Sequence, residues 1–468
     1  MNFAQLSFWE HLAIGVGIIL VLRLVVTRFF PGSDENFDKT ALVVLGLTLL
    51  LIVSWVAFVI YIVISVVTYV GLKWIQARHA DPRDATKYLV ILIPLQLLPL
   101  FYYKYSDFVV NRVVGLDIEV LRNLVIPVGI SFHSFQLVGF AVDTLVFRHP
   151  IPRFLDSLIF GSYFPQLVAG PIERRADLLP QVERFRFRWL PSDIDEGATW
   201  IAVGLFFKCC LADNLAAYFS RGRADNAYQI WLANVLFGFR IYYDFAGYSL
   251  VALGLSRCFG IRLTMNFRSP YCSTDIGEFW RRWHITLSQW FRDYVYVPMG
   301  GARTRFWAIN ILVVFIVSGI WHGAGWNFVW WGALHAVFLI VSRCTGRFAL
   351  PRPLGWALTM VAAFGAWLCF YELDTSVLLN KVAVLFRPAA YSLSALRATV
   401  SEYPVGDRTV LGGLGLLTLV TLVAEWLSVR WANEPYAYLY KRPVVIVLVI
   451  LTVLLAPGKN NGFIYFAF

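Results

Sequence analysis

The sequence predicts an all-α, polytopic membrane protein, and three observations support this prediction. Of the 468 residues, 59% are hydrophobic and only 15% are charged, whereas soluble domains have roughly 45–50% apolar and about 25% charged residues. Long apolar runs recur along the chain between short polar connections. Aromatic residues reach 17%, with 18 Trp, and Trp and Tyr favour the headgroup region of a bilayer. Lipid must therefore be the solvent for much of the surface.

The net charge of +11 also fits a membrane protein. Basic connections at residues 73–87, 174–188 and 262–305 lie between apolar runs and are predicted to be cytoplasmic by the positive-inside rule. This distribution argues against nucleic acid as a partner. The six Cys are scattered without a CxxC pair, so the sequence predicts neither a zinc site nor a disulfide framework.

Each apolar run is a candidate helix, because about 20 apolar residues cross a bilayer. The first begins at Phe8, and the run at 41–70 contains no Asp, Glu, Lys or Arg, so it is predicted to span with tilt or to extend past the interface. We expect ~10–12 transmembrane helices with re-entrant or interfacial segments. One membrane domain is predicted to fill residues 1–468. Further candidate runs are 88–103, 120–147, 154–170, 199–219, 230–258, 307–341, 356–371, 411–423 and 444–455.

Residues 307–341 form an apolar run that contains two histidines and no other ionisable group. As one helix at 1.5 Å per residue the run would be ~52 Å long, against a hydrocarbon core of about 30 Å, so a break is predicted. Gly319, Gly323 and Gly325 surround His322 and favour a break there. Non-helical backbone at membrane depth is buried in protein or lines a wet cavity. The pattern therefore predicts that His322 lies beside an internal cavity.

An intramembrane histidine has either a structural role, satisfied by a hydrogen bond from a neighbouring helix, or a functional one. Ionisable groups in a membrane are costly and are functional candidates by default, and the flanking glycines favour function for His322. His335 lies thirteen residues further on and would point away from His322 on a continuous helix. For His335 a structural role is favoured.

The segment 275–292 is too polar to span and predicts a helix in the interface or dipping into the protein. Trp280, His284 and Ser288 recur at i, i+4 and i+8 and would share one face of that helix. Taken alone, the pattern is typical of an interfacial anchor. A second interpretation is a gate that presents His284 to the same cavity as His322.

The charged side chains of this segment suggest contacts with a donor molecule. Glu278 and Arg282 are predicted to pair at i, i+4. Arg281, Arg282 and Arg292 are predicted to meet donor phosphates, because guanidinium groups bind phosphate bidentately.

Several segments in a specific order and spacing identify a family. They are 102–105 (YYKY), 127–132 (PVGISF), 164–172 (FPQLVAGPI), 243–249 (YDFAGYS), 266–271 (NFRSPY), 278–301, 321–323 (WHG) and 463–468 (FIYFAF). Over nearly its whole length the chain resembles the membrane-bound O-acyltransferase family, and most closely its bacterial polysaccharide branch, typified by alginate O-acetyltransferases and cellulose-acetylation proteins. Ala246, Leu250 and Ala467 stand where other residues are expected, and these departures leave the chemistry unaffected.

The resemblance implies a ring of helices around a central cavity or tunnel in the bacterial inner membrane. It implies that His322 matches the family's catalytic histidine and His284 the second histidine of the bacterial branch. It also implies a cytoplasmic acyl donor, acetyl-CoA, or an acyl carrier. A periplasmic acetyltransferase partner and polysaccharide synthase machinery are implied as well.

Acyl transfer to a hydroxyl needs a base, and neutral imidazole, with an unperturbed pKa of about 6.5, suits this role. We assign His322 as general base. His284 would orient the donor, polarise its carbonyl or relay the proton. The chain has no GxSxG nucleophile elbow, which disfavours a covalent serine enzyme, and nothing requires a metal or a permanently bound cofactor.

Asp244 is a supporting candidate in an apolar, aromatic context where a bare carboxylate is costly. A buried pair with Arg240, four residues back, is favoured over direct catalysis. Further candidates for substrate binding are Lys104, Gln166, Trp321 and Asn327.

Three alternatives stay open on the sequence alone. One is D-alanyl transfer from a carrier protein to teichoic acid within the same family. Another is long-chain acylation of a lipid or a protein. The third is a transporter or channel, although the chain lacks the repeated halves with interrupted helices that transporters often show.

Overall fold

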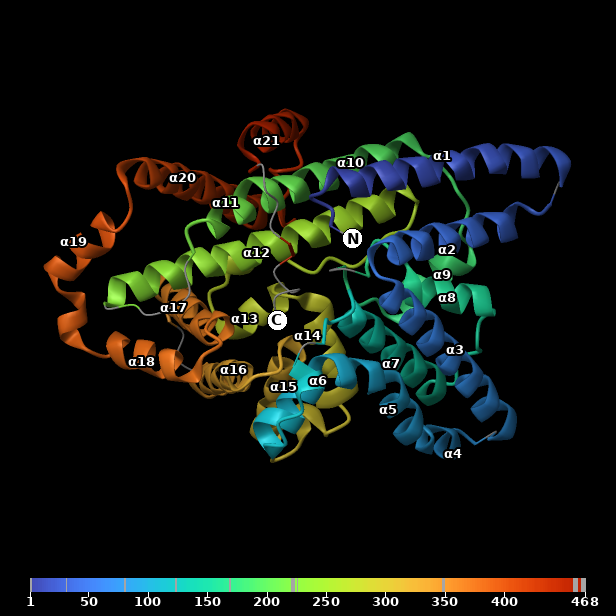
Figure 1. Cartoon of the computed structure of the whole chain (residues 1–468), viewed down its shortest axis with the longest axis horizontal. Helices are drawn as coiled ribbons and strands as arrows, with labels where there is room; N and C mark the ends of the chain where they lie inside the picture. Colours follow the sequence, from blue (N-terminus) through green and yellow to red (C-terminus); the bar gives the residue numbers. More distant parts are fainter. Residues whose placement is uncertain are drawn as a thin grey trace. The chain divides into compact units, whose positions relative to one another are not determined.

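The all-α prediction is confirmed by the computed structural model, which is 77% helical and has no β-strand among the residues that it describes (Figure 1). Two family segments are only partly described. Val168 and Ala169 of the segment 164–172 lie outside the described residues, as do residues 464–468 of the last segment, which include Ala467. The described ranges are 2–30, 32–79, 81–122, 124–167, 170–219, 224, 226–346, 350–457 and 462–463.

Within those ranges, eight helices are long and apolar enough to cross a membrane, and four shorter apolar helices accompany them. The protein is therefore a multi-pass membrane protein, as predicted. The eight candidate spans are Leu6–Phe29, Asp34–Val53, Trp55–Arg78, Asp84–Tyr105, Pro191–Ala216, Trp326–Thr345, Arg352–Tyr371 and Val405–Ala432.

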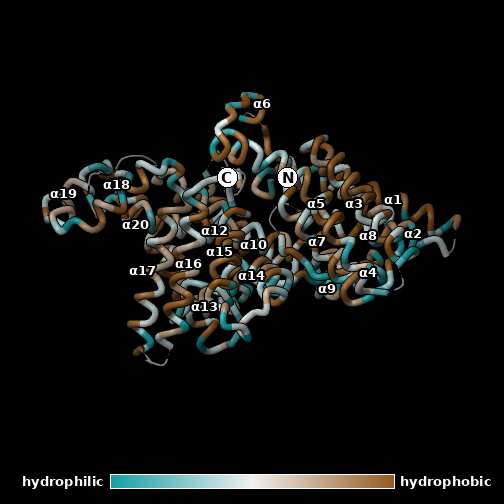
Figure 2. Tube along the Cα trace, turned by 90° about the horizontal axis from the view of Figure 1, so that it is seen from below, coloured by the Kyte–Doolittle hydropathy of each residue, from teal (hydrophilic) through white to brown (hydrophobic). Residues whose placement is uncertain are grey.

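The chain forms two compact units, and the first comprises Met1–Ile201 and Tyr248–Met265. Figure 2 shows the continuous apolar character of α3 and α5 in this unit. Its helices are α1 (Leu6–Phe29), α2 (Asp34–Val53), α3 (Trp55–Arg78), α4 (Pro82–Lys87), α5 (Leu89–Leu100), α6 (Glu119–Arg122), α7 (Ile130–Val146), α8 (Phe154–Ser162), α9 (Arg175–Glu183) and the π-helices η1 (Phe101–Tyr105) and η2 (Asp107–Val114).

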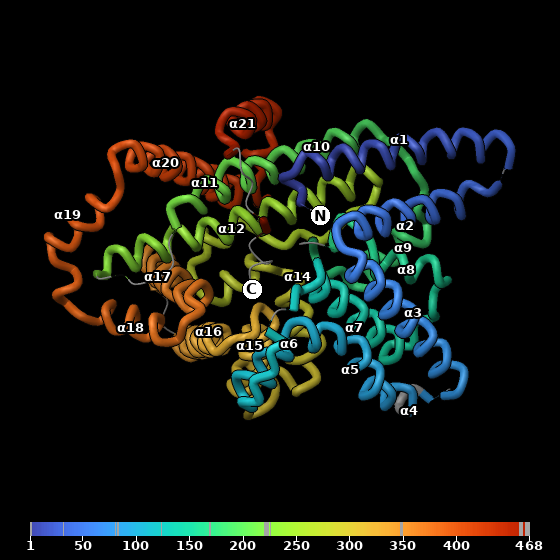
Figure 3. The backbone as a smooth tube through the Cα atoms, viewed as in Figure 1, coloured from blue at the N-terminus to red at the C-terminus, as the bar shows by residue number. Residues whose placement is uncertain are grey.

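The second unit comprises Ala202–Gly247 and Asn266–Phe468. Helices α10 (Pro191–Leu205) and α12 (Ala227–Cys258) contribute residues to both units. Figure 3 traces the chain of the second unit from α17 through α18 and α19 into α20. The other elements are η3 (Phe206–Ala212), α11 (Asp213–Ala216), η4 (Pro270–Cys272), α13 (Ile276–Arg282), α14 (Ile285–Phe291), η5 (Arg292–Tyr296), η6 (Gly301–Arg303), α15 (Trp307–His322), α16 (Trp326–Thr345), α17 (Arg352–Tyr371), α18 (Thr375–Leu385), η7 (Pro388–Tyr391), α19 (Leu393–Ser401), α20 (Val405–Leu427), η8 (Ser428–Ala432) and α21 (Arg442–Leu455).

The apolar run at 41–70 does not form one tilted span, and this prediction is wrong. The run is divided at Ser54, where α2 ends and α3 begins. Ser54 has extended backbone, and its side chain accepts a hydrogen bond from the backbone N–H of Ala57 at 3.2 Å. A serine cap of this kind starts a new helix, and it leaves no trace in a hydropathy pattern.

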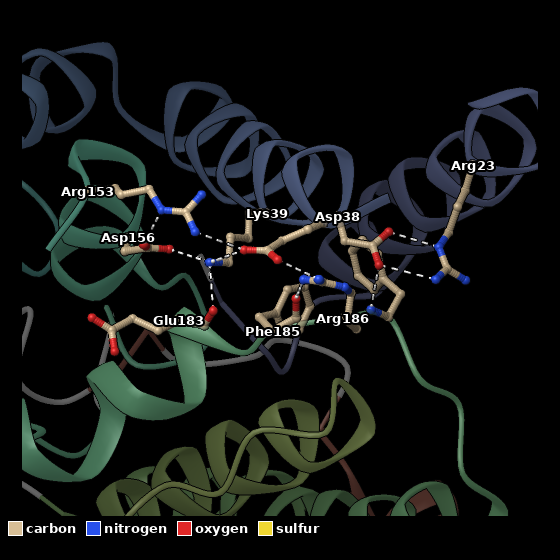
Figure 4. A network of polar contacts seen from close by, with 10 residues as sticks. Arg23, Asp38, Lys39, Arg153, Asp156, Glu183, Phe185 and Arg186 are labelled. Atoms are coloured by element: carbon tan, nitrogen blue, oxygen red, sulfur yellow. Dashed lines mark hydrogen bonds and ion pairs between the residues drawn. The ribbon is translucent and has the colours of Figure 1, made fainter. Parts of the chain in front are cut away.

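A network of charged side chains joins α1, α2, α8 and α9 in the first unit (Figure 4). Lys39 is buried, and its Nζ lies 2.8 Å from Asp156 Oδ1 and donates to the carbonyl of Glu183 at 2.8 Å. Its neighbour Asp38 accepts a hydrogen bond from Arg23 Nε at 2.8 Å. Buried charges are tolerated when they are paired in this way, so the network fixes the start of α2 against three other helices.

Two of the family segments meet at Gly129, which precedes α7 with φ +69°. Tyr61 donates from its hydroxyl to the carbonyl of Val128 at 2.7 Å. A Cβ at Gly129 would overlap the carbonyl oxygen of Leu167 and lie 2.5 Å from the Tyr61 hydroxyl. Only glycine satisfies both the left-handed backbone and this close approach.

We expect Gly129→Ala to destabilise the first unit by roughly 2 kcal/mol or more, because it adds left-handed strain and a steric overlap. The melting temperature in detergent, followed by size-exclusion chromatography after heating, measures the effect. Gly115→Ala is the matched control, since Gly115 has φ +82° and open space around it. Equal losses in the two variants would contradict the packing argument.

Candidate active site

The apolar run at 307–341 is broken, as predicted. Helix α15 ends at His322, and α16 begins at Trp326. The three residues between them include Gly323 and Gly325, which are extended at φ −164° and −168°. The two helices form a tightly packed hairpin, and His322 occupies the last position of the first helix.

The glycines act by allowing close contact rather than by their backbone freedom. A Cβ at Gly323 would overlap the ring of Phe328. Gly319 lies inside α15, where a Cβ would overlap the carbonyl of Phe328, so it lets the helices approach and does not form the break. Gly332 of α16 has the same role against Phe315.

His322 is buried, with 2% of its surface exposed. Aromatic rings surround it at centroid distances of 4.9 Å for Trp321, 5.1 Å for Trp331 and 5.2 Å for Phe370. Trp321 is itself buried and lies 5.8 Å from the ring of His284. These rings hold the imidazole in one place. That a wet cavity reaches it stays a prediction.

His335 also packs among aromatic rings, with Trp331 at 4.8 Å and Trp280 at 4.9 Å. It is completely buried, and in the described part of the chain neither ring nitrogen has a hydrogen-bond partner. The hydrogen bond expected for a structural histidine is therefore not found among the described residues, and the structural role of His335 stays a prediction.

The segment 275–292 is not one helix. The prediction that Trp280, His284 and Ser288 share one helical face is therefore wrong. Helix α13 ends at Arg282, and α14 starts after His284, whose φ of +41° is left-handed. Histidine tolerates this region better than most residues. The turn places His284 on a different side from Trp280 and Ser288.

Backbone hydrogen bonds from the family segment 266–271 hold this turn. Arg268 N donates to Arg282 O at 3.0 Å, and Ile285 N donates to Asn266 O at 2.9 Å. The Asn266 side chain accepts a further bond from the hydroxyl of Thr286 at 2.6 Å. The conformation on both sides of His284 is thereby fixed, which offsets the backbone strain of a left-handed residue.

The turn brings the two predicted catalytic histidines together. The ring of His284 is 1% exposed and lies 6.4 Å from the ring of His322. Phe245 of α12 packs edge-on against His284 at 4.7 Å. The two imidazoles come from separate elements and therefore pack in one cluster of aromatic side chains. All of these residues lie within the second unit.

A pocket of about 580 Å³ lies between α13, α14, η5, α15 and α16, and we call it the α13–α16 pocket. Its wall includes Trp280, Ser288 and Ser318, and the last of these is one helical turn before His322. Three arginines line it, Arg281, Arg292 and Arg343. The pocket thus combines positive charge with an apolar wall.

The three arginines differ in their carboxylate partners among the residues that the structure describes. Arg292 pairs with its neighbour Asp293 at 2.6 Å. In the described chain Arg281 and Arg343 form no ion pair, and Arg343 lies over the ring of Trp307 at 4.4 Å. Arg343 could not be predicted from local sequence, because its place in the pocket follows from the antiparallel return of α16.

Arg282 and Glu278 are paired as predicted, at 2.9 Å, but they line a different pocket from Arg281. Burial tends to raise the pKa of Glu278, yet hydrogen bonds from Thr274 and the charge of Arg282 hold it below its usual value. Four charged residues were predicted to contact the donor. Arg281 and Arg292 line the α13–α16 pocket, whereas Glu278 and Arg282 line the other pocket.

Asp244 is buried and lies 2.6 Å from Lys208 Nζ, which is also 2.8 Å from Asp213. A pair with Arg240 was the favoured prediction, and the contact with Lys208 was not predicted. The signal was present, since Lys208 is the one charged residue in the apolar stretch 199–212. Asp244 directly precedes Phe245 in α12. The ion-pair cluster therefore holds the part of α12 from which Phe245 packs on His284.

The remaining predicted residues have structural contacts of their own. Asn327 is buried and donates to the carbonyl of Cys369 at 3.0 Å, which joins α16 to α17. Gln166 is buried in the first unit and donates to Phe160 O at 3.2 Å. Lys104 lies in η1 of the same unit. Their roles in substrate binding stay predictions.

Comparison with known proteins gives the family directly. The model described as MBOAT, membrane-bound O-acyltransferase family, matches residues 43–378. A probable alginate O-acetylase of Pseudomonas aeruginosa is 33% identical, with 78% of this chain and 72% of the relative covered. A peptidoglycan O-acetyltransferase of Helicobacter pylori is 32% identical, with 69% and 70% covered. A teichoic acid D-alanyltransferase of Streptococcus thermophilus is 28% identical, with 69% and 80% covered.

The family resemblance drawn from the sequence segments is thereby confirmed, and the transporter or channel alternative is not. The match covers α15 and its histidine as well as the segment 275–292. This chain belongs to the membrane-bound O-acyltransferase family and is an O-acyltransferase.

Proposed function

We propose that this enzyme moves an acetyl group from acetyl-CoA toward hydroxyl groups of an exopolysaccharide, of the alginate or cellulose type, in the bacterial inner membrane. The observation that carries the proposal is the pair of buried histidines 6.4 Å apart at a helix break, in a chain of this family. The names of the alginate and peptidoglycan relatives support an acetyl group and a glycan acceptor.

In the proposed mechanism the neutral imidazole of His322 takes the proton of the acceptor hydroxyl. The oxygen then attacks the thioester carbonyl, the carbon–sulfur bond breaks, and the leaving thiolate receives the proton from the imidazolium. A positioned base of this kind contributes roughly 10²–10⁴-fold to the rate.

His284 and Trp321 are the neighbours that support this step. His284 is held by the turn described above, and it faces His322 from another element. We assign it to polarising the donor carbonyl or relaying the proton, and Trp321 to binding the substrate beside it.

The α13–α16 pocket is the proposed donor site. The nucleotide end of acetyl-CoA carries phosphates, and Arg281 and Arg343 offer guanidinium groups that no described carboxylate occupies. The pocket extends to Ser318, one turn before His322 on α15, and we propose that the thioester enters from this end. Arg282 and Glu278 are better explained as a structural pair than as donor contacts.

We expect Arg281→Ala and Arg343→Ala each to raise the KM for acetyl-CoA roughly 10-fold, because charged hydrogen bonds contribute about 1.5–3 kcal/mol. The maximal rate should change little. Initial rates of acetyl transfer by purified enzyme in nanodiscs provide the measurement. Arg397→Ala, an exposed arginine of α19, is the control, and an equal effect there would argue against a donor site.

A periplasmic acetyltransferase and the polysaccharide synthase machinery are the proposed partners, because the acceptor polymer lies outside the cytoplasm. The alternative within the family is D-alanyl transfer to teichoic acid from a carrier protein, which the streptococcal relative favours. Purified enzyme incubated with labelled acetyl-CoA, or with a D-alanyl carrier protein, separates the two. Transfer from the carrier alone would overturn the acetyl proposal.

A further inference from the structure

A second, larger pocket lies in the same unit, on the other side of α13. It has a volume of about 910 Å³ and is formed by the segment 271–282, the start of α17 and the end of α20 with η8. We call it the α17–α20 pocket. Neither histidine of the candidate active site lines it.

The pocket carries excess positive charge. Arg282, Arg352 and Arg430 line it, against the single carboxylate of Glu278. Glu278 is already engaged by Arg282 at 2.9 Å and by Thr274 Oγ1 at 3.0 Å. In the described residues Arg352 and Arg430 form no ion pair, so two guanidinium groups are available to an anionic ligand.

Those two arginines stand at the ends of candidate membrane spans. Arg352 is the first residue of the span Arg352–Tyr371, and Arg430 lies two residues before the end of the span Val405–Ala432. Because both side chains line one pocket, both ends lie at the same side of the bilayer. Trp356 and Trp426 border the pocket, as indoles commonly do at the headgroup level.

An apolar stripe continues from Arg430 along α20. Leu419, Val423 and Trp426 line the pocket at spacings of four and three residues, so they share one face of the helix. They remain 57%, 46% and 50% exposed. From Leu419 to Arg430 the stripe is ~16 Å long at 1.5 Å per residue, which is the length of most of an acyl chain.

We propose that the α17–α20 pocket binds an anionic glycerophospholipid, with its phosphate at Arg352 and Arg430 and an acyl chain along Leu419, Val423 and Trp426. Basic pockets between membrane helices hold anionic headgroups in this manner. A soluble phosphate would satisfy the arginines but leave the stripe uncovered. The ligand is therefore an amphiphile that the membrane itself supplies.

The position of α13 connects this pocket to the active site. Glu278 and Arg282 line the α17–α20 pocket, whereas Trp280 and Arg281 line the α13–α16 pocket. The helix then leads directly into the turn that carries His284. A bound lipid thus supports α13 from outside and helps to position the turn.

The test is native mass spectrometry of the full-length protein, extracted into detergent and titrated with phosphatidylglycerol or with phosphatidylcholine of matched chain length. We expect tighter binding of phosphatidylglycerol, and Arg352→Ala/Arg430→Ala should weaken it about 30-fold. Arg387→Ala/Arg397→Ala, which removes the same charge from exposed positions outside the pocket, should leave it unchanged. Equal weakening in both double variants would overturn the site.

A competition experiment distinguishes the two sources of phosphate. Inorganic phosphate or free coenzyme A at millimolar concentration should not displace the lipid. Displacement by either in the wild type, with loss of that effect in Arg352→Ala/Arg430→Ala, would assign the pocket to a soluble ligand instead. Because the readout is lipid binding, its outcome does not depend on the acetyl transfer proposed above.

Discussion

The enzyme with His322→Ala is expected to transfer acetyl groups about 10²–10⁴-fold more slowly than the wild type. The imidazole is the group assigned to deprotonate the acceptor, and alanine offers no base at the end of α15. Rates per folded enzyme in nanodiscs, with labelled acetyl-CoA, measure the loss. Normalisation to folded enzyme is needed because removing this buried ring also leaves a cavity among its aromatic neighbours.

His335→Gln is the appropriate control, because it changes a second buried imidazole on the same hairpin. Its rate per folded molecule should stay within about tenfold of the wild type, since a role confined to packing acts on stability. If His322→Ala kept full acetylation in cells at normal expression, the assignment of the base would be wrong. Partial recovery of His322→Ala by added imidazole would support it.

Lys208→Met is expected to destabilise the second unit by about 3–5 kcal/mol, the usual cost of leaving buried charge uncompensated. Lys208 is 2% exposed and is paired with Asp213 at 2.8 Å and Asp244 at 2.6 Å. Removing its ammonium group takes away the buried cation that lies against both carboxylates. The melting temperature and the yield of monodisperse protein in detergent provide the measurement.

A charge-neutral variant tests whether the loss is electrostatic. Lys208→Met/Asp213→Asn/Asp244→Asn removes all three charges while keeping similar volumes, and it should regain most of the lost stability. Cys209→Ala, at the next buried position, controls for a general sensitivity of η3. A triple variant as unstable as Lys208→Met alone would show that packing rather than charge governs this cluster.

Much of the fold could be predicted, because helices that lie in lipid must be composed mainly of apolar residues. The long apolar runs correspond to helices, and the run at 307–341 breaks beside His322, since its length exceeds the bilayer core. The division at Ser54 could not be found in this way. A single hydroxyl that caps α3 has almost no effect on hydropathy, yet it ends one helix and starts another.

The geometry of the candidate site was only partly predictable. His322 and His284 were proposed from local context and family segments, but the helical periodicity of 275–292 gave the wrong geometry around His284. That periodicity assumes continuous helix, and the backbone bonds from Asn266 and Arg268 replace it with a turn. Lys208 and Arg343 were missed because each acquires its role from a distant element.

By itself the sequence determined that this protein is a helical membrane protein of a known acyltransferase family, that its apolar hairpin breaks near a histidine, and which histidines to consider. Only the tertiary structure decided that these rings lie 6.4 Å apart, that Lys208 neutralises Asp244, and that α13 divides its arginines between two pockets. The reason is physical. Solvent preference and local conformation act on neighbouring residues and so can be read along the chain. Which side chains meet depends on how closely distant helices pack, as Gly319 and Gly332 allow here.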